Sequence, residues 1–210
     1  MAYPVDVGDR LQRPLVSWLP IYFEHETLGC LRIEYFQEER DFFEVKKMLN
    51  REIESGDTYP YKSVMNDEAF RAYFLSADAF VLRVKNPEDK SLDVVLGTFY
   101  VKPNFPGRSS HICNGGFITE SHFRGRGLGR LMGKLFPFVG KALGYRASLF
   151  NLVYVSNEAS LALWESLLYK PVGRIPDAGL LKGIGFTDAV QFYRDFADIS
   201  FDELSSLEFF

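Results

Sequence analysis

A glycine-rich turn at residues 124–130, Arg-Gly-Arg-Gly-Leu-Gly-Arg, constrains the fold of this chain more than any other stretch. The apolar run at 111–119 before it has the pattern of a strand, and apolar residues recur at helical spacing from Leu128 to Val139 after it. Such a turn points backbone N–H groups outward at the helix end that carries partial positive charge, and three arginines add to that potential. The sequence therefore predicts a site for a phosphate or pyrophosphate group.

Two common phosphate-binding motifs do not fit this turn. A dinucleotide fingerprint needs Gly-x-Gly-x-x-Gly and an acidic residue about twenty positions later, whereas here the spacing is Gly-x-Gly-x-Gly and no acidic residue follows before Glu158. A P-loop needs Ser or Thr after its Gly-Lys pair, and Gly133-Lys134 is followed by Leu135. The pattern that remains is Arg-x-x-Gly-x-Gly, formed by Arg124, Gly127 and Gly129.

This pattern resembles the acyl-CoA pyrophosphate loop of the GCN5-related N-acetyltransferase (GNAT) superfamily. The buried-strand pattern at 147–155 and the helix that begins near Asn157 fit the order of elements in that superfamily. Further stretches resemble the fungal N-acetyltransferases that detoxify L-azetidine-2-carboxylate and other proline analogues, namely 52–60, 96–104, 113–117 and 150–157. The resemblance extends over residues 30–195.

The resemblance implies an α+β fold, an α/β/α sandwich with a mixed central sheet that splays apart between the strands at 110–119 and 147–155. Acyl-CoA would enter that wedge. It also implies an acetyl-CoA-dependent N-acetyltransferase acting on a small amino acid, best represented by L-azetidine-2-carboxylate and other proline analogues, in detoxification and oxidative stress tolerance. Acetyl-CoA would be the co-substrate, no metal would be needed, and the protein would be a homodimer.

The resemblance further assigns site residues. Asn114 and Asn151 would hold the carboxylate of the amino acid, with Phe117 against its ring. Asn114 and Asn157 would be catalytic, Asn157 by stabilising the CoA thiolate. The cofactor-binding residues would be Phe117, Ile118, Arg124, Gly125, Arg126, Gly127, Leu128, Gly129, Arg130 and Asn157.

Two chemical requirements lack an obvious residue. A lysine-like amine has a pKa of about 10.4, so presenting it neutral at pH 7 costs about 4–5 kcal/mol. The nearest candidate bases are His111, at the outer end of its strand, and Glu120, just beyond it; we expect deprotonation through ordered water or before binding. The superfamily often has a Tyr that protonates the departing CoA sulfur, at the position seven residues after Asn157. This chain has Trp164 there, and its indole is a very poor acid.

Gly115-Gly116 inside the strand at 110–119 predicts a β-bulge or a close backbone approach. A bulge adds one residue and reverses the alternation of faces. With it, Asn114 and Phe117 would share one face of the sheet, beside the thioester.

The chain reads as one domain, residues 29–196, with an irregular N-terminal arm at 1–28 and a C-terminal tail at 197–210 that forms a short helix or a packed strap. Helical patterns cover 38–54, ended by Gly56, and 66–75, capped by Asn66 or Asp67. Pro137 predicts a kink or an end of the third helix near residue 136. Strands are expected at 31–36, 79–84, 94–101, 110–119, 147–155, 171–176 and 188–195.

Composition argues against other classes of protein. A net charge of −4 makes nucleic acid an unexpected partner, and no apolar run approaches the about 20 residues of a membrane span. Two distant cysteines and three histidines without ligand spacing give neither a disulfide framework nor a metal site. The N-terminus lacks the features of a signal peptide or presequence, so the cytosol is the simplest compartment, with mitochondrion and nucleus left open.

Two other functions stay open. The same fold acting on a peptide α-amine, lysine or a polyamine would need Glu120, Asp177 and Glu158 to line the pocket. A non-catalytic module that binds CoA or RNA would explain the missing tyrosine and base.

Overall fold

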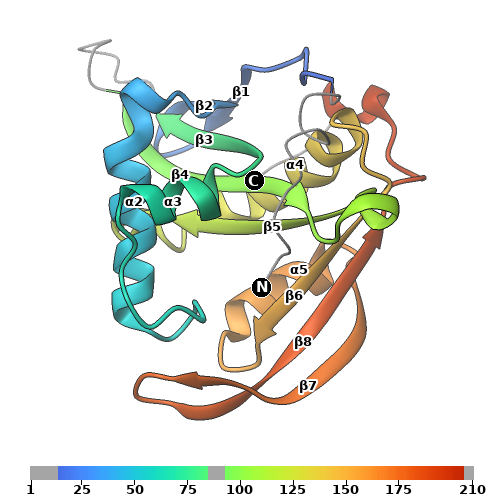
Figure 1. The fold of residues 1–210 in the computed structure, drawn as a ribbon. Helices are drawn as coiled ribbons and strands as arrows, with labels where there is room; N and C mark the ends of the chain where they lie inside the picture. The colour runs from blue at the N-terminus through green and yellow to red at the C-terminus, as the bar shows by residue number, and fades with distance from the viewer. Residues whose placement is uncertain (1–13, 85–92, 206–210) are drawn as a thin grey trace.

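The computed structural model describes residues 14–84 and 93–205, which form a mixed sheet of eight strands and four α-helices (Figure 1). The strand order is β1-β2-β3-β4-β5-β6-β8-β7, and all neighbours are antiparallel except β5 and β6. This confirms the predicted α+β class. The strands are β1 (Ile21–His25), β2 (Gly29–Tyr35), β3 (Asp78–Val84), β4 (Val94–Pro103), β5 (Ile112–Thr119), β6 (Ala147–Tyr154), β7 (Lys170–Leu181) and β8 (Gly185–Asp195).

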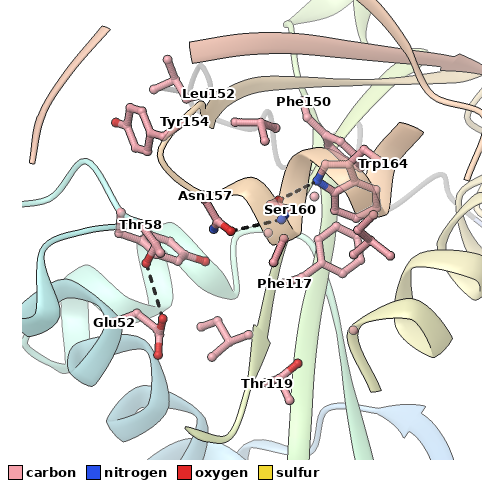
Figure 2. A pocket seen from close by; sticks show the side chains of 18 of the residues that line it. Glu52, Thr58, Phe117, Thr119, Phe150, Leu152, Tyr154, Asn157, Ser160 and Trp164 are labelled. Atoms are coloured by element: carbon pink, nitrogen blue, oxygen red, sulfur yellow. Dashed lines mark hydrogen bonds between the residues drawn. The ribbon is translucent and has the colours of Figure 1, made fainter. Parts of the chain in front are cut away.

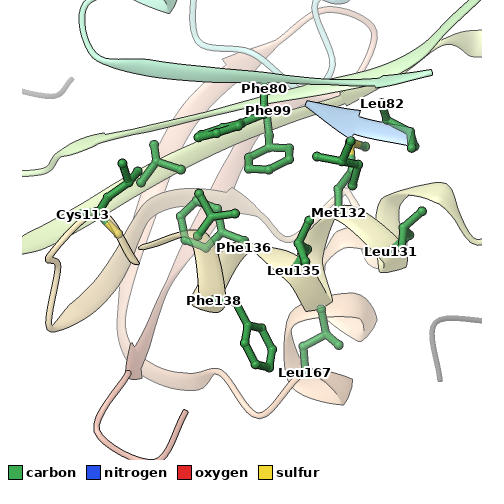
Figure 3. Packing of buried hydrophobic residues seen from close by; sticks show 14 of the residues in the cluster. Phe80, Leu82, Phe99, Cys113, Leu131, Met132, Leu135, Phe136, Phe138 and Leu167 are labelled. Atoms are coloured by element: carbon green, nitrogen blue, oxygen red, sulfur yellow. The ribbon is translucent and has the colours of Figure 1, made fainter. Parts of the chain in front are cut away.

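The helices lie on both faces of the sheet. They are α2 (Glu38–Ser55), α3 (Asp67–Phe74), α4 (Leu128–Ala142) and α5 (Glu158–Ser166), with short 3₁₀ helices at Gly107–Ser109, Ser121–Phe123 and Phe201–Ser205. One buried cluster joins α2 and α3 to β3 and β4 through residues such as Phe70 and Tyr100. The other joins the opposite face to α4 and α5, with Phe80 and Phe99 against Phe136 (Figure 3). The sandwich therefore has one main core on each face of the sheet.

The strand β1 is an addition to the expected sheet, because it lies in the stretch predicted to be an irregular arm. It pairs with β2 from Ile21–Ile33 to His25–Gly29. The His25 ring supports the tight turn between them, since its Nδ1 accepts hydrogen bonds from the backbone N–H groups of Thr27 and Leu28, at 3.2 Å each. The tail contributes the 3₁₀ helix at Phe201–Ser205; its last five residues, like the first thirteen of the arm, lie outside the described residues.

Local signals placed the ends of two helices correctly. Gly56 follows α2 with a φ of 75°, and the Asn66 side chain caps α3 by accepting a hydrogen bond from the Ala69 N–H. Of the two outcomes predicted at Pro137, an end of the third helix near residue 136 is wrong, because α4 continues through Pro137 to Ala142; a kink there stays a prediction. Phe138 and Val139 beyond the proline are buried, and that burial outweighs the local cost of the proline.

The predicted splay between β5 and β6 is confirmed. The two strands pair only at Ile112–Ala147 and Cys113–Ser148, and they separate beyond these residues. On its other side, β6 carries an extra residue relative to β8 between Phe150 and Val153. The wedge therefore opens directly after Cys113, with Asn114 as the first residue of β5 inside it.

The predicted bulge at Gly115-Gly116 is wrong, because β4 and β5 pair without interruption from Gly97–Thr119 to Pro103–Cys113. The close approach is confirmed instead. A Cβ atom at Gly116 would lie 2.5 Å from Tyr100 Cε1, and one at Gly115 would lie 2.5 Å from Phe136 Cε2, on the opposite face. Since alternation is intact, Asn114 and Phe117 point to opposite faces of the sheet and not to a shared one.

Candidate active site

One cavity of about 720 Å³ joins the glycine-rich turn, the splay between β5 and β6, and the loop at 57–61 that follows α2 (Figure 2). Its lining includes every residue that the sequence assigns to the site except Arg126. Because these residues come from four parts of the chain, namely β5, the turn at 124–130, β6 and the N-cap of α5, the fold brings the predicted site together in one place.

The glycine-rich turn presents the start of α4 to this cavity. Gly125 and Gly127 have φ angles of 73° and 78°, and Gly127 is the N-cap of α4. No described side chain caps the helix, so its first N–H groups remain available to a ligand. Gly129, two residues after Gly127, also lines the cavity. This geometry suits a diphosphate, because backbone donors and the positive end of the helix coincide.

The three arginines of the turn are held in different ways. The Arg124 guanidinium forms an ion pair with Glu52 of α2, and its Nε donates to the Thr119 carbonyl at 3.3 Å. Arg130 donates to Ser166 Oγ at 2.9 Å. Arg126 is tied through its backbone, since its carbonyl oxygen lies 3.0 Å from His25 Nε2. Only Arg124 and Arg130 reach the cavity wall.

Phe117 belongs to an aromatic cluster on the α4 and α5 side of β5. Its ring centroid lies 4.9 Å from that of Trp164 and 5.8 Å from that of Phe150. Figure 2 shows the three side chains beside one another. Trp164 is buried and its Nε1–H donates to Ser160 Oγ at 3.0 Å. The indole N–H therefore already has an acceptor, which agrees with its exclusion as a proton donor.

Asn157 caps α5, because its Oδ1 accepts a hydrogen bond from the Ser160 N–H at 3.1 Å. With the oxygen directed to the helix, the amide N–H₂ group is the part of the side chain that can donate to a ligand. Ser160 is a residue that the sequence analysis missed. Since its Oγ accepts from Trp164, its own O–H proton is left to donate elsewhere in the cavity. The spacing of Ser160 and Trp164, one helical turn apart, was the available signal.

The two strand asparagines have different surroundings. Asn151 and Asn104 exchange amide hydrogen bonds of 2.9 and 2.6 Å, and Asn104 is only 1 % exposed. The side-chain amide of Asn114 has no hydrogen-bond partner among the described residues. It lies on the face of β5 that carries Gly116. Both line the cavity. The Asn151 amide is thus largely engaged by the protein itself.

The cavity wall on that second face is aromatic and was not foreseen. It is formed by Tyr73 from α3, Tyr100 from β4, and Tyr59 and Tyr61 from the loop after α2. The Tyr73 and Tyr100 hydroxyl oxygens lie 3.1 Å apart. Burial raises the pKa of Tyr59, Tyr73 and Tyr100, so these phenols are neutral near pH 7. Lys102 of β4 completes the wall.

The candidate bases also need revision. Glu120 does not line the cavity; it forms an ion pair with Arg51. Burial would raise the pKa of Glu120, but hydrogen bonds from Ser121 and His122 and the charge of Arg51 outweigh it and lower that pKa. Neither is His111 in the lining. The carboxylates that do line it are Glu52 and Asp57, and burial raises the pKa of Glu52 despite the opposing charge of Arg124.

Within residues 14–84 and 93–205, no group of three or more His, Cys, Asp or Glu side chains is arranged to hold a metal ion. Of the helices in the same segments, none combines the length and apolar character needed to cross a membrane.

Comparison with known proteins gives the family. No family model matches the chain. It is 37 % identical over 163 residues to the N-acetyltransferase aca1 of Schizosaccharomyces pombe, which covers 72 % of this chain and 78 % of that protein. A GCN5-related N-acetyltransferase from Kribbella flavida has the same fold, with a TM-score of 0.70 and 25 % identity over 79 % of this chain and 97 % of that one.

A phosphinothricin acetyltransferase from Sinorhizobium meliloti, solved in complex with acetyl-CoA, superposes with a TM-score of 0.68 over 79 % of this chain and 88 % of that one. At 15 % identity this likeness shows the fold alone. The chain belongs to the GCN5-related N-acetyltransferase superfamily. It is an N-acetyltransferase. Acetyl-CoA, the predicted co-substrate, is the molecule bound in the Sinorhizobium meliloti structure.

Proposed function

We propose that the protein transfers the acetyl group of acetyl-CoA to the amine of a small amino acid, with L-azetidine-2-carboxylate and other proline analogues as acceptors. The observation that supports this best is a single cavity that joins the glycine-rich turn at 124–130 to the splay between β5 and β6 and to an aromatic wall beyond it. Acetylation leaves the amino-acid nitrogen without a nucleophilic lone pair, so it can no longer form a peptide bond. That is the basis of the detoxification role that we propose.

The donor half of the site binds and positions the thioester. We assign the diphosphate to the N–H groups at the start of α4 and the thioester to the wedge beside β5. Attack by the amine forms the N–C bond, and collapse of the adduct breaks the C–S bond. The Asn157 and Ser160 side chains both line the wedge, and each accepts a hydrogen bond from the protein and keeps an N–H or O–H group that can donate to a ligand, so we assign them to the thiolate that leaves.

The acceptor half holds the amino acid on the opposite face of β5. Tyrosine rings there match a small apolar ring, and Asn114 supplies a polar contact beside them. We propose direct attack, because Cys113, the thiol next to the wedge, is fully buried in the core. The protonated amine loses one proton to become the nucleophile, and Glu52, a lining carboxylate with a raised pKa, is suited to receive it through water. The second N–H proton leaves after the N–C bond has formed and ends on the CoA sulfur, which is released as the thiol.

A polyamine or lysine acceptor is less well supported. That function needs Glu120, Asp177 and Glu158 in the pocket, and none of these three lines the cavity. The aromatic wall instead favours a compact acceptor over an extended cation.

The proposed acceptor is tested by incubating the enzyme with acetyl-CoA and one acceptor at a time while free thiol is followed. The panel contains L-azetidine-2-carboxylate, L-proline, spermidine and a histone-like peptide. We expect thiol release with the azetidine, together with an N-acetylated product identified by mass spectrometry. Faster release with spermidine or the peptide would replace the proposed acceptor with that one.

A further inference from the structure

Lys102 places a buried positive charge in the wall of the acceptor half without an anion beside it. The residue is 4 % exposed, and its Nζ donates to the Tyr73 carbonyl at 2.8 Å. The Nζ also lies over the rings of Tyr73 and Tyr100, 4.1 and 4.4 Å from their centroids. No carboxylate among the described residues lies within the 4.0 Å of an ion pair.

This environment stabilises an ammonium group only in part. An ammonium has three N–H donors, and one carbonyl and two ring faces do not replace the water it has lost. Burying a charge without an opposite charge is unfavourable, and the pKa of Lys102 falls to about 8 as a result of its burial. Because Lys102 lines the cavity, a bound anion can supply what the protein does not.

The neighbour of Lys102 across the sheet is Asn114. These two residues are directly paired in the antiparallel register of β4 and β5, so their side chains lie on the same face. Side chains paired in this way have Cβ atoms about 4.5–5.5 Å apart. An ammonium and an amide therefore stand side by side at the apex of the wedge, and two donors at that spacing match the two oxygens of one carboxylate.

We propose that Lys102 is the anchor for the carboxylate of the acceptor, with Asn114 as the second donor. The enzyme then selects acceptors that carry a carboxylate close to the reacting amine. This assignment rests on the proposed function and refines it, because Lys102 takes the place that the sequence analysis gave to Asn151. The Asn151 amide is already paired with Asn104.

The same charge acts on the amine that reacts. A protonated acceptor amine next to Lys102 is a like charge, which favours loss of the amine proton and so helps to form the nucleophile. A polyamine brings positive charge and no carboxylate, so it is repelled. Lys102 thus discriminates by charge, while the tyrosines discriminate by shape.

A purely structural role has to be separated from this one. The Tyr73 carbonyl belongs to the last turn of α3, and a lysine there also stabilises the helix end. A structural role would change stability without changing the preference between a carboxylate and its uncharged amide. The ratio of those two affinities is therefore the decisive quantity.

The experiment measures binding of L-azetidine-2-carboxylate and of its carboxamide to the enzyme–CoA complex at pH 7 by titration calorimetry. We expect the wild type to bind the carboxylate about 10- to 100-fold more tightly, as for a hydrogen-bonded charge pair. Lys102→Met should bring the ratio close to one, and Lys102→Arg should retain most of it. An equal ratio in the wild type, or an unchanged ratio in Lys102→Met, overturns the assignment.

Lys102→Gln, which keeps a donor but no charge, serves if Lys102→Met does not fold, and it should lose the preference equally. Turnover of the same two compounds separates the two proposals. If the binding preference for the carboxylate depends on Lys102 but neither compound is acetylated, L-azetidine-2-carboxylate is not the acceptor, while Lys102 still anchors a carboxylate. Equal transfer to both compounds would refute the anchor and leave the transferase.

Discussion

The ammonium of Lys102 sets the pH range over which a carboxylate binds. Only its protonated form pairs with an anion, and its pKa in the free protein is lowered to about 8 by burial. Affinity for cyclobutanecarboxylate, a probe without an amine, should be full below that pH and fall about tenfold per unit above it. Tyr73 and Tyr100, which face the ammonium, have raised pKa values and stay neutral in this window. Calorimetry across pH 7–10 measures how the affinity for this probe depends on pH. Lys102→Met should bind it with an affinity that does not change with pH. The same pH-independent affinity in the wild type would contradict the role of Lys102.

Asn151 and Asn104 should behave as one structural unit. Replacing Asn151 with Ala leaves the buried Asn104 amide without its partner, at a cost of about 1–3 kcal/mol in the free energy of unfolding. Asn104→Ala should cost a similar amount, and the double variant clearly less than the sum. Urea denaturation gives all three values. Additive effects would show that the pair does not act as a unit.

Asn114 offers the matched contrast to that pair. Its amide has no protein partner in the part of the chain that the structure describes, so Asn114→Ala should leave stability nearly unchanged. It should lower amino-acid turnover with little effect on CoA affinity, because it lies in the acceptor half. Steady-state kinetics with each substrate varied in turn would show this. Unchanged kinetics in Asn114→Ala would remove the residue from the site.

The turn that begins α4 depends on backbone geometry that only glycine adopts easily. Gly127 has a φ of 78°, and a β-branched residue there should distort the N–H groups that face the diphosphate. Gly127→Val should therefore abolish measurable CoA binding in calorimetry. Gly144→Val is the control, because Gly144 has a φ of 85° but does not line the cavity. If both variants fold and bind CoA alike, the turn is not the diphosphate site.

Elements with local signals could be predicted from the sequence, whereas those that depend on distant packing could not. Gly56 and Asn66 mark helix ends by their own conformation and hydrogen bonds, so α2 and α3 were foreseen. Pro137 did not end α4 as its local effect predicts, because the residues after it are buried and that burial is a tertiary effect. The supposed bulge at Gly115-Gly116 failed because those glycines make room for Tyr100 and Phe136, which the sequence does not place beside them.

The residues of the site likewise divide into those with a local sequence signal and those that distant packing brings together. Most of its donor half lies within one continuous stretch, from β5 to the start of α4, and a short motif therefore revealed it. Its acceptor half draws on α2, α3, β4 and the loop at 57–61, so Glu52, the tyrosines and Lys102 were missed. A charged residue within the buried strand β4 was the one signal for Lys102. The homodimer and the division into arm, domain and tail remain predictions.

The most direct test of the account follows thiol release by the full chain supplied with acetyl-CoA and L-azetidine-2-carboxylate, with Gly127→Val run in parallel. We expect thiol release that saturates with the azetidine, a product acetylated on its ring nitrogen, and no release above background in Gly127→Val. A wild-type rate no greater than that of Gly127→Val, with acetyl-CoA bound and the protein folded, would contradict it.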